Sequence, residues 1–160
     1  MTGPAERPGA ARRAEAYPRL RRFAEGLPFR LDDFQRTACE ALERGSGVLV
    51  CAPTGAGKTV VGEFAVYLAL HDGQPGRPRK CFYTTPIKAL SNQKYHDLVR
   101  RYGPERVGLL TGDNSINGDA PVVVMTTEVL RNMLYAGSPA LLGLAYVVMD
   151  EVHYLADRFR

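Results

Sequence analysis

The sequence predicts an α/β domain in which a parallel sheet is covered by helices on both faces. Short, continuous apolar runs bounded by glycine or polar residues are typical of strands buried on both faces of a sheet. These runs alternate along the 160-residue chain with segments in which apolar residues recur every three or four positions, as in amphipathic helices. Such alternation favours parallel strands, because each helix can carry the chain back across the sheet.

Five apolar runs are predicted to be strands. They cover residues 47–51, 80–85, 107–111, 122–126 and 144–149. Because the carboxyl ends of parallel strands open on one edge of a sheet, polar residues at these strand exits are expected to lie along that edge.

The helices follow from periodic apolar positions and from signals at their ends. Residues 17–25 are expected to form a short helix. Asp32 or Asp33 can cap a second helix, which runs to about Arg44 and is stopped by Gly45. Further helices are predicted over 58–70, from Pro86 onward, and around the apolar stripe Val129, Leu130, Met133 and Leu134.

The basic charge of the chain belongs to its N-terminal part. The net charge is +4, and residues 1–30 hold seven arginines and three glutamates, so residues 31–160 are net neutral. Residues 1–16 are rich in Ala, Arg, Gly and Pro, and we expect a disordered tail there, followed by a domain over 17–160. Such a tail is usually solvated; direct contact with nucleic-acid phosphates is the alternative.

Composition disfavours several kinds of site and compartment. Cys39, Cys51 and Cys81 are odd in number and lack metal-ligand spacing, so zinc and disulfides are not expected. No apolar run approaches the ~18 residues of a membrane span. The N-terminal arginines are not followed by an apolar segment, as they would be in a secretory signal. We therefore expect a cytoplasmic protein that does not bind membranes.

Residues 52–59, Ala-Pro-Thr-Gly-Ala-Gly-Lys-Thr, follow a predicted strand and begin a predicted helix. A phosphate-binding P-loop requires that setting. Its glycines let backbone N–H groups turn towards phosphates, and the helix N-terminus attracts their charge. Lys58 can reach the β- and γ-phosphates, and the Thr59 hydroxyl can ligate Mg²⁺. The predicted nucleotide-binding residues are Thr54, Gly55, Ala56, Gly57, Lys58 and Thr59.

Asp150 and Glu151 follow the last predicted strand, at the edge where open α/β sheets bind ligands. One carboxylate can hold Mg²⁺ while the other activates the attacking water, as phosphoryl transfer needs. Alone, such a pair is usually a solvated loop, but a P-loop in the same chain favours the catalytic interpretation. We predict that Asp150 is the metal ligand and that Glu151 and Lys58 are catalytic.

The string Asp-Glu-Val-His at 150–153 resembles the motif of the DExH-box helicases of superfamily two. More narrowly, residues 27–160 resemble the superkiller and exosome-cofactor branch, since several motifs occur in the same order. The resemblance implies a RecA-like P-loop domain, the cofactors ATP and Mg²⁺, and a single-stranded nucleic acid as partner. The branch's Ser-Ala-Thr motif and second motor domain are absent, so we expect a C-terminally truncated, incomplete first RecA-like domain. By the resemblance, the missing strand would lie between 47–51 and 144–149, and no ladder should join these two runs.

The same resemblance assigns two further groups of residues. Phe29 would stack on adenine and Gln35 would hydrogen-bond its edge, although Phe29 could equally be a hydrophobic staple on the following helix. Segments 84–95, 111–113 and 126–131 resemble motifs that grip a nucleic-acid strand. The residues predicted to contact it are Pro86, Lys88, Ala89, Gly112, Thr126, Thr127 and Glu128. Such contacts go mainly to phosphate and sugar and are indifferent to base sequence.

The function implied is that of an ATP-dependent helicase, in which hydrolysis drives strand translocation and unwinding. RNA is favoured over DNA, because residues 86–95 and 126–135 resemble RNA-acting members of the branch. A DNA-repair-type helicase, a P-loop phosphotransferase and a bare nucleotide-binding module are the alternatives. The isolated chain is expected to be inactive, and its oligomeric state is left open.

Overall fold

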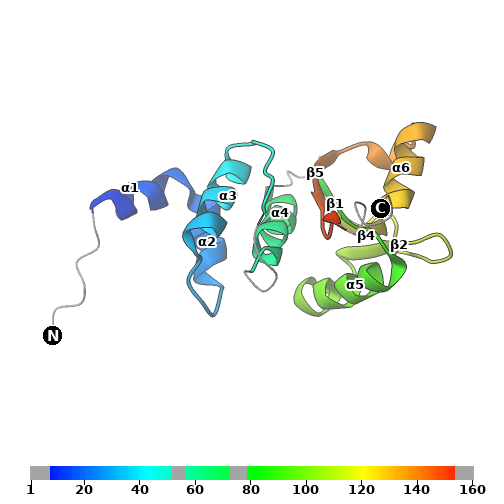
Figure 1. Ribbon diagram of the computed structural model, residues 1–160, viewed down its shortest axis with the longest axis horizontal. Coiled ribbons are helices and arrows are strands. Elements are labelled where there is room, and N and C mark those ends of the chain that lie inside the picture. The colour runs from blue at the N-terminus through cyan, green and yellow to red at the C-terminus, as the bar shows by residue number, and fades with distance from the viewer. Residues whose placement is uncertain (1–7, 52–56, 73–78, 154–160) are drawn as a thin grey trace. The chain divides into compact units, whose positions relative to one another are not determined.

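The computed structural model of the protein describes residues 8–51, 57–72 and 79–153 (Figure 1). The chain divides into two compact units, residues 1–64 and 65–160. None of the helices in the described ranges is long and apolar enough to cross a bilayer.

The described part of the first unit contains α1 (Pro8–Ala16), α2 (Pro18–Glu25), α3 (Asp33–Glu43) and the start of α4 (Thr59–Asp72). The prediction of a disordered tail over 1–16 is wrong for residues 8–16, which form α1. Alanine and arginine are strong helix formers, and proline suits a first helical turn. Residues 8–16 therefore form a helix through intrinsic propensity, although they have no apolar stripe.

Helices α2 and α3 are joined through a side-chain cap. The Glu43 carboxylate on α3 accepts hydrogen bonds from the backbone N–H groups of Arg19 and Leu20 at 3.0 and 2.9 Å. It thereby satisfies donors that the first turn of α2 leaves unpaired. Phe23 on α2 is 3% exposed, and its ring centroid lies 5.1 Å from that of Phe64.

Both ends of α3 follow the sequence prediction. At its start, the N–H of Asp32 donates to Oε1 of Gln35 at 2.9 Å, in a capping box. At its end, Gly45 has a φ of +87° and donates its N–H to the Leu42 carbonyl at 2.9 Å. A left-handed glycine of this kind closes the helix at little steric cost.

Residues 47–51, predicted to be a buried strand, form no strand and pair with none of the described strands. Leu49 is 81% exposed. The prediction of a buried strand is therefore wrong here, and the absence of a ladder with residues 144–149 stays a prediction. An apolar run suits a strand but becomes one only where a neighbour satisfies its N–H and C=O groups.

Five strands form the sheet of the second unit, in the order β3-β2-β4-β1-β5. They are β1 (Lys80–Thr85), β2 (Val107–Leu110), β3 (Ser115–Ile116), β4 (Val122–Thr126) and β5 (Leu144–Met149). The pairs β1–β4, β1–β5 and β2–β4 are parallel, as predicted. The unpredicted β3 is antiparallel to β2 at the edge of the sheet, and its two exposed residues are too few to show a periodic pattern.

Helices cover both faces of this sheet, as predicted (Figure 1). They are the second half of α4 (Thr59–Asp72), α5 (Lys88–Tyr102), α6 (Thr127–Ala136) and the short 3-10 helix η1 (Pro139–Leu141). One face is buried by α4 and α5, whose Val66 and Leu98 lie in a core with Tyr83. The other face, with Phe82 and Met125, is buried by α6 and η1.

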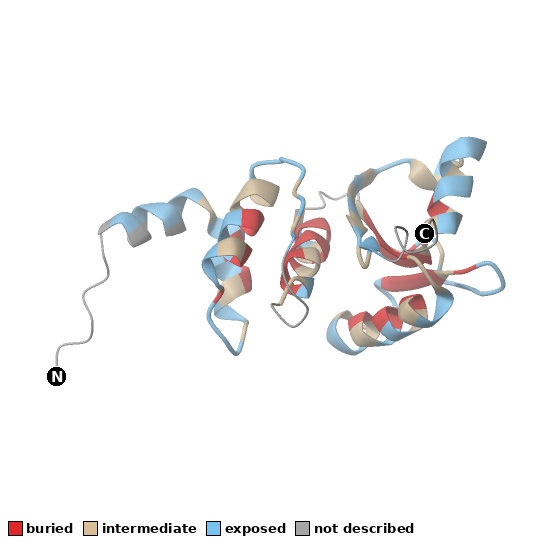
Figure 2. Cartoon of the chain, viewed as in Figure 1, coloured by how far each residue is buried: buried red, intermediate tan, exposed pale blue. Residues whose placement is uncertain are grey.

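Strand β5 is less buried than the strands at the centre of the sheet (Figure 2). Its residues alternate between half-buried and exposed, and Val147 and Met149 are 45% and 51% exposed. By contrast, β1 and β4 are buried along almost their whole length. Within the described ranges β5 pairs with β1 alone, so its outer side has no strand neighbour there.

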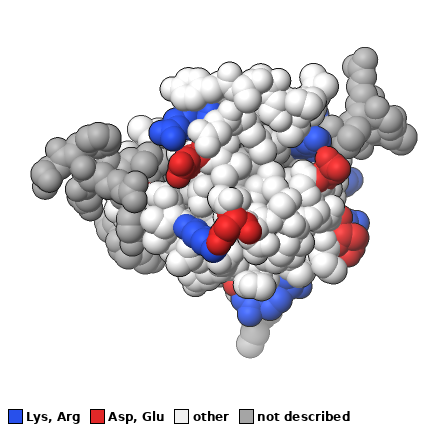
Figure 3. All heavy atoms as spheres, turned by 90° about the vertical axis from the view of Figure 1, so that its right-hand side faces the viewer, with Lys and Arg blue, Asp and Glu red and all other residues white. Residues whose placement is uncertain are grey.

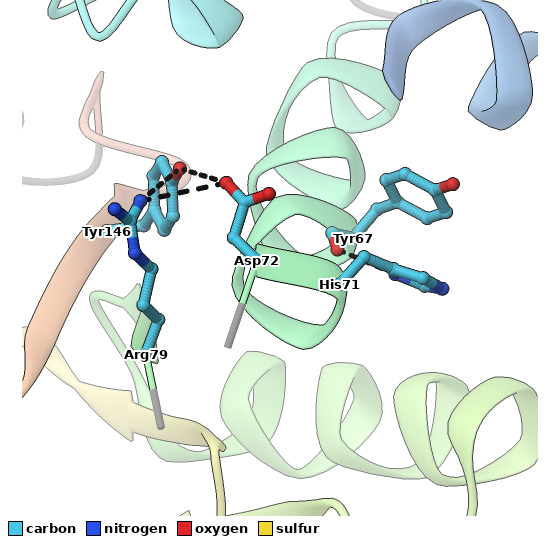
Figure 4. Close-up of polar contacts among 5 residues, drawn as sticks. All are labelled: Tyr67, His71, Asp72, Arg79 and Tyr146. Carbon is cyan, nitrogen blue, oxygen red and sulfur yellow. Dashed lines mark hydrogen bonds and ion pairs between the residues drawn. The ribbon is translucent and has the colours of Figure 1, made fainter. Parts of the chain in front are cut away.

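A buried carboxylate joins the end of α4 to β5 (Figure 4). Asp72, whose side chain is 3% exposed, accepts a hydrogen bond from the Tyr146 hydroxyl at 3.3 Å and lies 3.6 Å from the Arg79 guanidinium. Burial, and then the Asp72 charge, raise the pKa of Tyr146 above its ordinary value, so its hydroxyl stays protonated. On the opposite side of α4, His71 stacks on Tyr67 with ring centroids 3.9 Å apart.

Candidate functional site

The carboxyl edge of the sheet carries a pocket of about 430 Å³. It is lined by residues from the end of β4 and the starts of α5 and α6, and by the segment that follows β2. These residues are Pro86, Ile87, Lys88, Gly112, Asp113, Thr126 and Glu128. The structure thus brings together five of the seven predicted nucleic-acid contacts, at positions 86, 88, 112, 126 and 128. Of the other two, Ala89 is exposed on α5 and Thr127 is half-buried at the start of α6.

Hydroxyl groups fix the backbone around this pocket. Thr126 is the N-cap of α6, and its Oγ1 accepts a hydrogen bond from the N–H of Val129 at 3.4 Å. The Thr127 hydroxyl donates to the Thr85 carbonyl at 3.3 Å, which ties α6 to the end of β1. The Thr85 hydroxyl in turn lies 2.7 Å from that of Ser91 on α5. Both helices therefore direct their N-terminal ends, which favour negative charge, to this edge.

Helix α5 begins two residues later than predicted. Pro86 was expected in its first turn, but Ile87 is the N-cap, with an extended backbone, and Lys88 is the first helical residue. The Thr85 hydroxyl donates to the Ile87 carbonyl at 3.0 Å, which stabilises this turn ahead of the helix. Pro86 and Lys88 consequently both reach the pocket.

Lys88 is paired with a carboxylate in the pocket. Its ammonium donates to Oδ2 of Asp113, and the Thr111 hydroxyl donates to Oδ1 at 3.2 Å. The hydrogen bond from Lys88 is the main reason why the pKa of Asp113 lies below its ordinary value. The carboxyl is therefore charged near neutral pH, and a phosphate at this position would compete with it for the Lys88 ammonium.

The surface of the second unit carries mixed charge. On the face in Figure 3, Lys and Arg side chains lie beside Asp and Glu side chains and form no single basic patch. Arg100 is paired with Asp97 on α5, and Arg131 lies 3.8 Å from Glu128 on α6. A strand bound at the pocket would therefore depend on hydroxyl groups and backbone N–H groups more than on bulk positive charge.

The acidic pair lies at the end of β5, on the same edge of the sheet. The N–H of Asp150 donates to the Thr84 carbonyl at 2.9 Å, beside the last β1–β5 pair. Both carboxylate oxygens of Asp150 accept hydrogen bonds, Oδ1 from the N–H of Glu151 at 2.9 Å and Oδ2 from the Tyr83 hydroxyl at 2.7 Å. These two donors fix the orientation of the Asp150 carboxylate.

Glu151 has a left-handed backbone, with a φ of +55°. This conformation costs a non-glycine residue on the order of 1 kcal/mol, and such strain collects at functional sites. The Glu151 side chain is 40% exposed, and its Oε2 lies 3.1 Å from Nε2 of His153. A half-exposed carboxylate of this kind can accept a proton from a water molecule.

The first unit contains the predicted phosphate loop, of which Thr54, Gly55 and Ala56 lie outside the described residues. Lys58 directly precedes α4, and Thr59 is its first, exposed residue. The predicted helix start at the end of the loop is therefore confirmed.

Gly57 is held by Gln35. It has a φ of +80°, and its carbonyl accepts a hydrogen bond from Nε2 of Gln35 at 2.9 Å. A Cβ at position 57 would lie 2.5 Å from that nitrogen, so a larger residue would displace the Gln35 amide as well as strain the backbone. Gln35 is only 4% exposed, and its amide joins the N-cap of α3 to the loop. Its contact with adenine stays a prediction.

Phe29 is 48% exposed. Leu31, which is 8% exposed, is the residue directly before the Asp32 N-cap and so occupies the staple position. The staple interpretation of Phe29 is therefore wrong, and its ring is accessible to a planar ligand.

Comparison with known proteins assigns the family. A sequence model described as DEAD/DEAH box helicase matches residues 32–160. The chain belongs to the DEAD/DEAH box helicase family. It is similar to "Probable helicase HelY" of Mycobacterium tuberculosis, with 75% identity over 141 residues, which are 88% of this chain and 15% of HelY. It is also similar to "ATP-dependent RNA helicase mtr4" of Schizosaccharomyces pombe, with 51% identity over 137 residues, 86% of this chain and 12% of mtr4.

The fold of this DEAD/DEAH box chain also has a solved counterpart. A hypothetical ATP-dependent RNA helicase from Sulfolobus tokodaii superimposes with a TM-score of 0.63 at 20% identity, over 89% of this chain and 43% of that one. The likeness concerns the fold and confirms the predicted RecA-like α/β class.

Two buried residues behind the acidic pair of this DEAD/DEAH box chain were not predicted. Tyr83 is 1% exposed, and Nζ of Lys94 lies 4.8 Å from the centroid of its ring. Lys94, on α5, is 8% exposed. A tyrosine within an apolar strand was a usable signal, because a buried tyrosine hydroxyl usually needs a hydrogen-bond partner.

Proposed function

We propose that the protein is an ATP-dependent helicase that moves along and unwinds RNA, and that residues 17–160 supply the first part of its first motor domain. The proposal rests mainly on the carboxyl edge of the sheet. There, hydroxyl groups and two helix N-termini surround a pocket, and a fixed carboxylate ends the neighbouring strand β5. Membership of the family favours a helicase over a P-loop phosphotransferase.

The residues present fit ATP with Mg²⁺. Among the described residues, no three His, Cys, Asp or Glu side chains gather to hold a metal. Mg²⁺ rarely needs such a cluster, since one or two protein ligands commonly suffice beside phosphates and water. Asp150 and the Thr59 hydroxyl would be its protein ligands, and Lys58 would contact the phosphates. Bound Mg²⁺ would neutralise charge on the phosphates, and Glu151 would accept the proton of the attacking water.

RNA is the proposed substrate because the relative mtr4 is named an RNA helicase. The relative HelY is named only a helicase. The discriminating experiment is the ATPase rate of the whole protein with matched single-stranded RNA or DNA. Stimulation by RNA is expected, and stimulation by DNA alone would favour the DNA-repair type.

Substitutions of the phosphate loop and the acidic pair test the chemistry. Lys58→Ala in the whole protein should lower ATP hydrolysis at least ~10²-fold, because removing a donor to developing charge costs about 3 kcal/mol. Glu151→Gln should keep ATP binding and lose turnover, since Asp150 remains. Lys80→Ala, at the amino end of β1, is the control and should hydrolyse ATP normally. Wild-type hydrolysis by either Lys58→Ala or Glu151→Gln would refute the assigned roles.

A further inference from the structure

Tyr83 reaches the acidic pair from beneath the sheet edge. It lies in the middle of β1, faces the core formed with α4 and α5, and is 1% exposed. Its hydroxyl nevertheless donates to Oδ2 of Asp150 at 2.7 Å. Asp150 is half-buried, and a hydrogen bond from a buried hydroxyl to a carboxylate is among the stronger kinds in proteins.

The Asp150 carboxylate retains room for a metal despite its two donors. A carboxylate offers about four lone-pair positions. The N–H of Glu151 takes one on Oδ1 and the Tyr83 hydroxyl takes one on Oδ2. The two donors therefore limit rotation of the carboxylate while leaving lone pairs that can face a cation.

Lys94 contacts the aromatic ring of Tyr83. Its ammonium lies 4.8 Å from the centroid of the Tyr83 ring, within the range of a cation–π interaction. A cation at the ring face draws electron density from the phenol, which makes the hydroxyl a stronger donor. Lys94 and Tyr83 thus form a buried support behind Asp150.

We propose that Tyr83 is a positioning residue for the metal ligand Asp150, and that it sets the affinity for Mg²⁺–nucleotide without touching nucleotide. This inference rests on the proposed function, in which Asp150 ligates the ion. Groups that hydrogen-bond to metal ligands typically contribute 10–100-fold to metal affinity. Loss of the Tyr83 hydroxyl should therefore weaken nucleotide binding only when Mg²⁺ is present.

The test uses equilibrium binding of a fluorescent ATP analogue to the whole protein, with Mg²⁺ and with EDTA. Tyr83→Phe preserves packing and removes only the hydroxyl; it should raise the Kd about tenfold with Mg²⁺ and leave the Kd in EDTA unchanged. Tyr146→Phe is a matched control, because it also removes a tyrosine hydroxyl that donates to an aspartate, in this case Asp72, which is not a proposed metal ligand. It should leave both constants unchanged.

Asp150→Asn separates failure of this inference from failure of the proposed function. If it abolishes the tighter binding seen with Mg²⁺ while Tyr83→Phe does not reduce it, the inference is wrong and the metal assignment stands. If Asp150→Asn keeps the full effect of Mg²⁺, the metal assignment itself is wrong, and the inference with it. Equal weakening of Tyr83→Phe with and without Mg²⁺ would show a merely structural role and overturn the inference.

Discussion

Replacement of Gly57 by alanine should sharply weaken ATP binding. Two costs follow from the structure. The φ of +80° is unfavourable for alanine by about 1–2 kcal/mol. The new Cβ would also displace the Gln35 amide, 2.5 Å away, and an unsatisfied buried donor costs about 1–3 kcal/mol. Together these give about 2–5 kcal/mol, or at least ~30-fold in affinity if binding requires the loop as it stands.

A double-mutant cycle distinguishes the two costs. ATP affinity would be measured by fluorescence titration for the wild type, Gly57→Ala, Gln35→Ala and the double variant. In the Gln35→Ala background the clash is absent, so Gly57→Ala should cost only the ~1–2 kcal/mol of backbone strain. Gly47→Ala is the control, because a Cβ there meets nothing within 4 Å. An equal cost of Gly57→Ala in both backgrounds would refute the proposed contact with Gln35.

Two further outcomes can be measured on the whole protein. Asp113→Asn should release Lys88 for contact with phosphate. Single-stranded RNA should then bind more tightly, and the slope of log K against log salt should steepen by up to ~0.7. Weaker binding would argue against Asp113 as a competitor for Lys88. Thiol labelling near pH 8, read by peptide mapping, should modify the exposed Cys51 much faster than Cys39 or Cys81. Burial raises the pKa of each of these two thiols to about 12. Rapid labelling of either buried thiol would contradict the core described above.

The strands β1, β4 and β5 could be predicted from sequence because each is a continuous apolar run. In the structure each of them also pairs with a neighbouring strand. Residues 47–51 show the same local pattern and form no strand. The pattern reports that a segment suits a sheet, whereas pairing depends on a neighbour elsewhere in the chain. The two-residue strand β3 left no pattern, since an antiparallel edge pair so short depends on tertiary context.

At the site, the sequence predicted side chains that could contact a ligand, but it missed the side chains that position them. Lys88, Thr126 and Glu128 stand at predicted strand exits or helix starts, so topology alone brought them to one pocket. The supports are different: Lys94 is a polar residue on a helix, and only the packing of α5 shows that it faces the ring of Tyr83. Side-chain direction across packed elements is not encoded in local spacing.

The outer side of β5 has consequences for handling the protein. Residues 144–149, Leu-Ala-Tyr-Val-Val-Met, contain no lysine, proline or other gatekeeper of the kind that keeps sheet edges from joining other molecules. With Val147 and Met149 half exposed and no second strand beside it in the described ranges, we expect this strand to favour intermolecular cross-β association. The 160-residue chain should therefore stay soluble longest in dilute solution and during short storage.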